Sequence, residues 1–82
     1  MPQNTQQWPV AVVTGGTSGI GLAIARTLAR DHQVYAIGRR PVARASEEHA
    51  HLILVSLDIR DSGAVADFVA TLPHLNVLVH SA

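Results

Sequence analysis

Cysteine and lysine are both absent from the 82-residue chain, and its six basic residues are all arginine. Without cysteine the chain has neither a disulfide framework nor a thiolate metal site. The formal net charge is zero, so no basic excess points to nucleic acid or an anionic membrane as a partner. No apolar run approaches the roughly 20 residues of a membrane span, and residues 1–8 lack a signal-peptide pattern. These features are compatible with a cytoplasmic protein.

Apolar residues make up 48% of the chain, which suits a packed core, and the length allows at most one small domain. Four short apolar runs predict strands, and each is continuous rather than alternating. Continuous runs are typical of parallel strands buried on both faces. The predicted strands cover residues 10–13, 34–37, 52–55 and 77–79.

Two helices are predicted between these strands from apolar residues at helical spacing. The first covers residues 20–29, where Ile20, Ile24 and Leu28 share one face. The second has Asp61 or Ser62 as its N-cap. Pro73 is expected to end this helix, whose apolar face comprises Val65, Phe68, Val69 and Leu72. Residues 41–51 have room for a short helix, but their amphipathic pattern is weak.

Alternating strands and helices predict an α/β fold with an open parallel sheet of strand order 3-2-1-4, half of a doubly wound fold. Residues 1–9 are expected to form a flexible leader before this partial domain, residues 10–82. The fourth predicted strand would leave an apolar edge without a covering helix, which natural sheets avoid. We therefore expect the chain to be the N-terminal part of a longer protein, truncated at its fourth strand.

A glycine-rich turn joins the first predicted strand to the first predicted helix, with the sequence Thr-Gly-Gly-Thr-Ser-Gly-Ile-Gly at residues 14–21. Such a turn brings backbone close to a phosphate and directs a helix N-terminus at its charge. The string differs from a P-loop, which would end in Gly-Lys-Ser or Gly-Lys-Thr. Its alternative interpretation is an ordinary turn between a strand and a helix.

The spacing Thr14-Gly15-x-x-x-Gly19-Ile20-Gly21 closely resembles the cofactor motif of the short-chain dehydrogenase/reductase family. The resemblance implies a Rossmann-type NAD(P)-binding domain, here its N-terminal half. It also implies that the first glycine makes the turn and that backbone around residues 18–20 holds the cofactor pyrophosphate. The residues assigned to this part of the site are Thr14, Gly15, Thr17, Ser18, Gly19, Ile20 and Gly21.

Arginines follow the second predicted strand, in the sequence Ile37-Gly38-Arg39-Arg40. A domain that prefers NAD would place an acid there, on the ribose 2′-hydroxyl. A guanidinium instead pairs with a 2′-phosphate through charge-assisted hydrogen bonds. NADP is therefore the predicted cofactor and NAD the less favoured one, with Arg39 the first candidate and Arg40 the second. The alternative is a pair of solvated arginines at a strand end.

Two further segments resemble the family's cofactor site. Asp58-Ile59 is similar to an Asp-Val or Asp-Ile pair, whose carboxylate meets the adenine amino group. An isolated aspartate after a strand is more often a turn or cap residue. His80-Ser81-Ala82 is similar to the start of Asn-Asn-Ala-Gly, which lines the nicotinamide ribose pocket, although it replaces both asparagines. A plain strand terminus is the alternative there.

No catalytic residue is predicted in this chain. The family's chemistry uses a serine and a Tyr-x-x-x-Lys pair, but this sequence has no lysine, and its single tyrosine, Tyr35, lies within a predicted strand. The five histidines have no partner ligands at metal-binding spacing, so no metal site is predicted.

The sequence thus predicts the cofactor-binding part of an NADP-dependent oxidoreductase. The full-length protein, expected to be a homo-oligomer, would transfer hydride between NADP(H) and a small carbonyl or alcohol substrate. Two alternatives are a non-catalytic dinucleotide-binding or sensor protein and an inactive truncated gene product.

Overall fold

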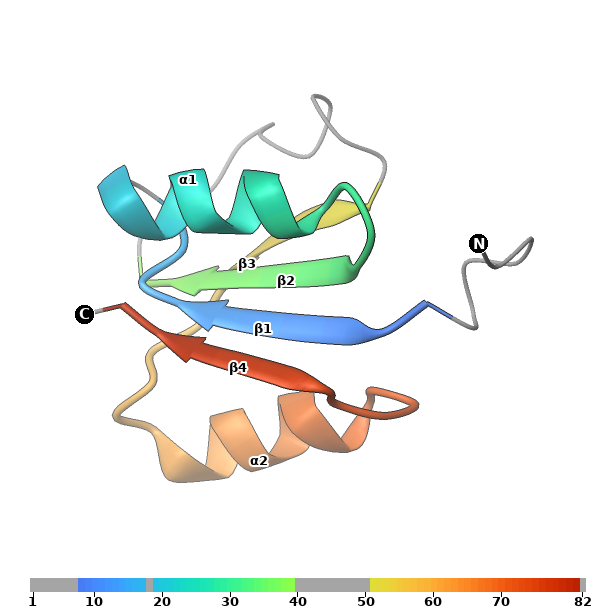
Figure 1. Ribbon diagram of the computed structural model, residues 1–82. Helices are drawn as coiled ribbons and strands as arrows, with labels where there is room; N and C mark the ends of the chain where they lie inside the picture. Colours follow the sequence, from blue (N-terminus) through green and yellow to red (C-terminus); the bar gives the residue numbers. More distant parts are fainter. Residues whose placement is uncertain (1–7, 18, 40–50, 82) are drawn as a thin grey trace.

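The computed structural model describes residues 8–17, 19–39 and 51–81. Its elements follow one another in the predicted alternation of strands and helices (Figure 1). The elements are β1 (Val10–Thr14), α1 (Gly19–Leu28), β2 (Gln33–Gly38), β3 (Leu52–Ser56), α2 (Ser62–Ala70) and β4 (Val77–His80). The predicted short helix at 41–51 lies almost wholly outside the described residues.

The four strands form one parallel sheet in the order β3-β2-β1-β4, which confirms the predicted topology. All four strands end at the same edge of the sheet, and both helices begin there (Figure 1). At this edge Thr14 pairs with Ile37 on one side and with His80 on the other. The carboxyl ends of the strands therefore bring together segments that lie far apart in the sequence.

One face of the sheet packs against α1 and contains the main hydrophobic core. Small side chains on the helix, Ala25 and Ala29, are buried and allow it to lie close to the strands. The buried strand residues of this core are Ala11, Val13, Val34, Ala36 and Leu52. Close packing of α1 on β1 and β2 fixes the helix start next to the end of β1.

The opposite face carries α2, whose residues are all at least partly exposed. Tyr35 on β2 meets Phe68 of α2 edge to face, with ring centroids 5.5 Å apart. Asp61 is the N-cap of α2, because its Oδ1 accepts a hydrogen bond of 3.0 Å from the Ala64 N–H. The helix ends at Ala70, so Leu72, predicted on its apolar face, lies beyond it.

The prediction that all four strands are buried on both faces is correct only for β1. In β4 half-buried and exposed residues alternate, and the side chain of Leu78 is 64% exposed. The reason is position, because β3 and β4 are the outer strands of the described sheet and α2 covers the second face only in part.

The expected leader, residues 1–9, lies outside the described residues except for its last two positions. The Trp8 ring lies 4.2 Å from the His51 ring, and its carbonyl oxygen is 3.0 Å from His74 Nε2. The Pro9 carbonyl accepts a hydrogen bond from the Gln33 N–H at 2.9 Å. These two residues are held against the amino-terminal edge of the sheet, away from the glycine turn.

Neither of the helices described here has both the length and the apolar character needed to cross a membrane.

Candidate functional site

The glycine turn after β1 is fixed to the end of β2 by its own backbone. The N–H groups of Gly15 and Gly16 both donate to the Ile37 carbonyl oxygen, at 2.8 and 3.1 Å. Gly15 has a φ of 70°, a conformation that glycine adopts without steric cost. The first glycine therefore makes the turn, as the family resemblance implies, and its N–H is already paired within the protein.

Gly21 allows α1 to begin directly against this turn. A Cβ atom at residue 21 would lie 2.1 Å from the carbonyl oxygen of Gly15, which is far inside van der Waals contact. Only a residue without a side chain permits this approach of helix to turn. The glycine spacing thus places the start of α1 beside the end of β1.

The N-terminus of α1 is open and has the polarity of an anion-binding site. The first N–H groups of an α-helix have no carbonyl partner within the helix and carry the positive end of its dipole. No acidic residue lies in the first turn of α1 to offset this charge. Gly19 has a φ of 59°, nothing lies within 4 Å of the position its Cβ would take, and Ile20 is 77% exposed. A phosphate group can therefore approach this backbone closely.

The end of β2 lies against the same turn. A Cβ atom at Gly38 would be 2.1 Å from Thr17 Oγ1 and 3.0 Å from Thr17 Cβ, so Thr17 occupies the space beside Gly38. Arg39 follows at the exposed edge, and its carbonyl oxygen accepts a 3.4 Å hydrogen bond from Ser56 of β3. The structure thus places Thr17 against Gly38, the residue before Arg39, while Arg40 lies outside the described residues.

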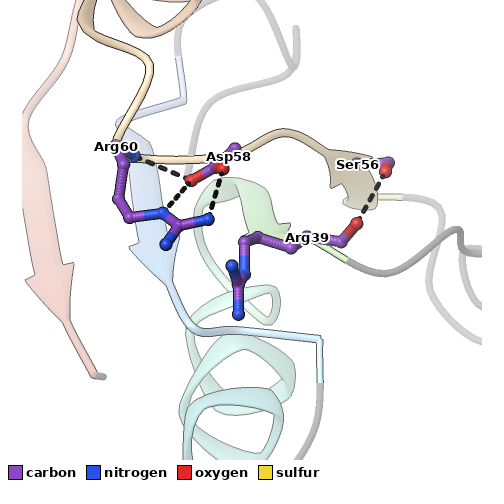
Figure 2. Close-up of polar contacts among 4 residues, drawn as sticks. All are labelled: Arg39, Ser56, Asp58 and Arg60. Atoms are coloured by element: carbon purple, nitrogen blue, oxygen red, sulfur yellow. Dashed lines mark hydrogen bonds and ion pairs between the residues drawn. The ribbon is translucent and has the colours of Figure 1, made fainter.

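After β3, Asp58 is held in a turn by its own carboxylate and backbone (Figure 2). Its Oδ1 accepts from the Arg60 backbone N–H at 2.9 Å and from Nε at 3.1 Å. Its Oδ2 accepts from Arg60 Nη2 at 3.0 Å. The Asp58 carbonyl oxygen also accepts a 3.0 Å bond from the Asp61 N–H, which leads the chain into α2. The alternative interpretation of Asp58 as a turn residue therefore agrees with the structure, and its role in cofactor binding stays a prediction.

Arg60 also sets the charge of Asp58. Its side-chain and backbone hydrogen bonds lower the pKa of the Asp58 carboxyl to about 2, and the more distant charge of Arg39 adds to the effect. The same pairing raises the pKa of the Arg60 guanidinium. Asp58 is thus ionised throughout the neutral range. Sequence reasoning missed Arg60, although a residue two positions beyond an aspartate is well placed to bond it in a turn.

The end of β4 joins the site through Thr14. The Ser81 N–H donates to the Thr14 carbonyl oxygen at 3.0 Å, and Thr14 Oγ1 lies 2.7 Å from His80 Nδ1. Sequence reasoning placed Ser81 at this edge but assigned no role to His80. The parallel register of β1 and β4 makes His80 the neighbour of Thr14.

Most of the predicted site residues therefore meet at the carboxyl edge of the sheet. Ile59 lies nearby in the turn after β3 and is 39% exposed. Three predicted residues lie outside the described part of the chain, namely Ser18, Arg40 and Ala82. Tyr35 is within β2 and packs on Phe68. Among residues 8–17, 19–39 and 51–81 no group of histidines and carboxylates is arranged to hold a metal ion.

Comparison with known proteins shows the family to which this chain belongs. Residues 9–82 match the short chain dehydrogenase family. The chain belongs to this family. Its members are oxidoreductases that use NAD(P).

Solved structures of the same family are similar over most of this chain. A Corynebacterium glutamicum protein provisionally classed as a short-chain dehydrogenase/reductase is 40% identical, with a TM-score of 0.73, over 89% of this chain and 43% of its own. The 3-oxoacyl-[acyl-carrier protein] reductase from Brucella melitensis, in complex with NAD, is 28% identical, with a TM-score of 0.69, over 93% of this chain and 34% of its own.

A protein provisionally described as a β-ketoacyl-ACP reductase is 35% identical, with a TM-score of 0.73, over 96% of this chain. The chain spans only 34% of the length of that protein. No curated protein matches the sequence significantly. The similarity therefore concerns a segment of these larger proteins.

Proposed function

We propose that this chain is the N-terminal cofactor-binding segment of an NADP-dependent short-chain oxidoreductase. The observation that carries the proposal is the open N-terminus of α1, which Gly21 places against the turn after β1. The bound cofactor would supply hydride transfer to or from a carbonyl or alcohol substrate. The substrate, a homo-oligomeric state and a cytoplasmic location remain predictions.

In this proposal the cofactor pyrophosphate binds the backbone at the start of α1, in the segment Thr17 to Gly21. Since the Gly15 and Gly16 N–H groups are paired with Ile37, their part is to shape the turn. Thr14 links β1 to β4 beneath the site. The remaining assignments are Arg39 and Arg40 to the 2′-phosphate, Asp58 and Ile59 to the adenine, and Ser81 and Ala82 to the nicotinamide ribose.

The end of β2 supports NADP over NAD. An acidic side chain at residue 38, which would bond the 2′-hydroxyl of NAD, has no room there because Thr17 fills the space. Arg39, the next residue, is exposed and has guanidinium donors suited to a phosphate. Of Arg39 and Arg60, the two described arginines at this edge, Arg60 is paired with Asp58, which leaves Arg39 for the 2′-phosphate.

The test is titration of the full-length protein with NADPH and NADH at moderate ionic strength. We expect NADPH to bind at least about tenfold more tightly, because one charge-assisted contact to the 2′-phosphate contributes about 1.5–3 kcal/mol. The preference should shrink as salt is raised, since added salt screens an exposed ion pair. Equal affinities at low salt would contradict the assignment of NADP.

A second prediction concerns Gly19. We expect Gly19→Val to abolish measurable cofactor binding, because a branched side chain would enter the space open to the pyrophosphate and would be strained at a φ of 59°. Gly19→Ala gives a graded comparison with less bulk. Thermal unfolding reports the strain separately from binding, and undiminished binding by a folded Gly19→Val protein would show that the phosphates lie elsewhere.

A further inference from the structure

The hydrogen bonds around Asp58 leave its carboxylate with little capacity to accept further hydrogen bonds. An ionised carboxylate has about four acceptor positions, two on each oxygen. Oδ1 uses both of its positions, on the backbone N–H and on Nε of Arg60. Oδ2 uses one position, on Arg60 Nη2. The hydrogen bonds among the described residues therefore leave a single acceptor position, and it lies on Oδ2.

Arg60 also fixes the direction of that position. Its Nε and Nη2 atoms bond different oxygens of the same carboxylate, and a two-point contact of this kind sets the plane of the group. The Asp58 side chain is 39% exposed, so the open side of Oδ2 can be reached by a ligand. Figure 2 shows the Arg60 guanidinium folded back on Asp58 rather than extended away from it.

We propose that Arg60 is a positioning residue that presents the last acceptor position of Asp58 Oδ2 to the purine of the cofactor, and so selects a 6-amino purine over a 6-oxo purine. The inference rests on the proposed function, in which Asp58 meets the adenine. An amino group donates one N–H to this position. An oxo group places an acceptor against an acceptor, so the contact becomes repulsive and both groups lose a hydrogen bond.

The low pKa of Asp58 reflects the same contacts, because the hydrogen bonds from Arg60 favour the charged form of the carboxyl. When Arg60 is present, the Asp58 carboxyl is mainly charged above a pH of about 2, because its pKa is lowered to that value. Without Arg60 the pKa should return toward 3.8, its ordinary value. Titration of the Asp58 carboxyl by NMR in wild-type and Arg60→Gln protein measures this change directly.

The test compares the dissociation constants of NADPH and its hypoxanthine analogue, deamino-NADPH, with the full-length protein. We expect wild-type protein to favour NADPH by about tenfold, the value of one hydrogen bond to a charged group. Arg60→Gln should reduce this ratio to about threefold or less. Arg60→Lys keeps the charge but lacks the two-point contact, so it should lower the ratio while the pKa of Asp58 stays depressed.

Asp58→Asn is the matched variant for the other residue of the contact between Arg60 and Asp58. Its amide oxygen can still accept the Arg60 backbone N–H and keep the turn, while its NH₂ group can donate to an oxo group. We therefore expect the preference for NADPH to disappear or to reverse. Arg60 is 73% exposed, so its variants should fold, and thermal unfolding checks this.

The outcomes separate the two proposals. If wild-type protein binds neither nucleotide, the proposed function fails and the inference fails with it. If wild-type protein favours NADPH and Arg60→Gln keeps the same ratio, the proposed function stands and the role of Arg60 is wrong. Tighter NADPH binding by Arg60→Gln would also overturn the inference, since Arg60 would then compete with the purine for Asp58.

Discussion

Replacement of Gly21 by alanine is expected to abolish cofactor binding and to destabilise the protein by about 3 kcal/mol. The added methyl group would lie 2.1 Å from the Gly15 carbonyl oxygen and 2.8 Å from its carbonyl carbon. Both atoms belong to the backbone, so the clash cannot be relieved by a change of rotamer. The start of α1 would have to move away from the turn, and the proposed phosphate site would be lost with it.

Gly63→Ala is the matched control, because it makes the same chemical change in α2. A Cβ atom at residue 63 would be 3.6 Å from Asp61 Oδ1, an ordinary contact. Alanine is more stable than glycine within a helix by about 0.5–1 kcal/mol, so stability should hold or rise. Denaturant unfolding and NADPH titration of both variants measure the two effects. Normal NADPH binding by Gly21→Ala would disprove the glycine-turn assignment.

The second large effect is expected at Arg39. Arg39→Asp should shift the ratio of NADPH to NADH affinity by about two orders of magnitude toward NADH. The change removes a cation from the proposed 2′-phosphate contact and puts a repelling carboxylate in its place. The same carboxylate can accept a hydrogen bond from the 2′-hydroxyl of NADH, so binding of NADH should be kept or improved.

Arg30→Asp provides the charge control for this experiment. It changes the net charge equally but lies just beyond the end of α1, at the far end of the helix from the glycine turn. Its effect on the ratio should be small and should vanish in salt, because the ten residues of α1, at about 1.5 Å per residue, hold Arg30 farther from the glycine turn than the Debye length of about 10 Å at 0.1 M. An unchanged ratio in Arg39→Asp would mean that the 2′-phosphate is bound by other residues.

The sequence predicts the fold of this chain well because its signals are local and agree with one another. Apolar runs mark the strands, Asp61 caps α2, and the glycine spacing fixes the turn between β1 and α1. The order of the strands follows from the general rules for parallel crossovers. The open edge at β4 follows from the predicted strand order, whereas burial of β3 and β4 on both faces, which their apolar runs suggested, is not found.

Contacts between side chains were not predictable in the same way. The Thr17 contact with Gly38 depends on how the turn folds over β2. The approach of His80 to Thr14 depends on the register of two strands that are distant in sequence. The double contact of Arg60 with Asp58 depends on the rotamer of an exposed side chain, which no sequence pattern sets.

The single carbonyl of Ile37 that accepts from both Gly15 and Gly16 has a thermodynamic consequence. Those two glycines give up their conformational entropy when the sheet forms, before any nucleotide arrives. The loss belongs to folding rather than to association, so this part of the loop is preorganised. Nucleotide capture at this edge need not wait for these two residues to become ordered.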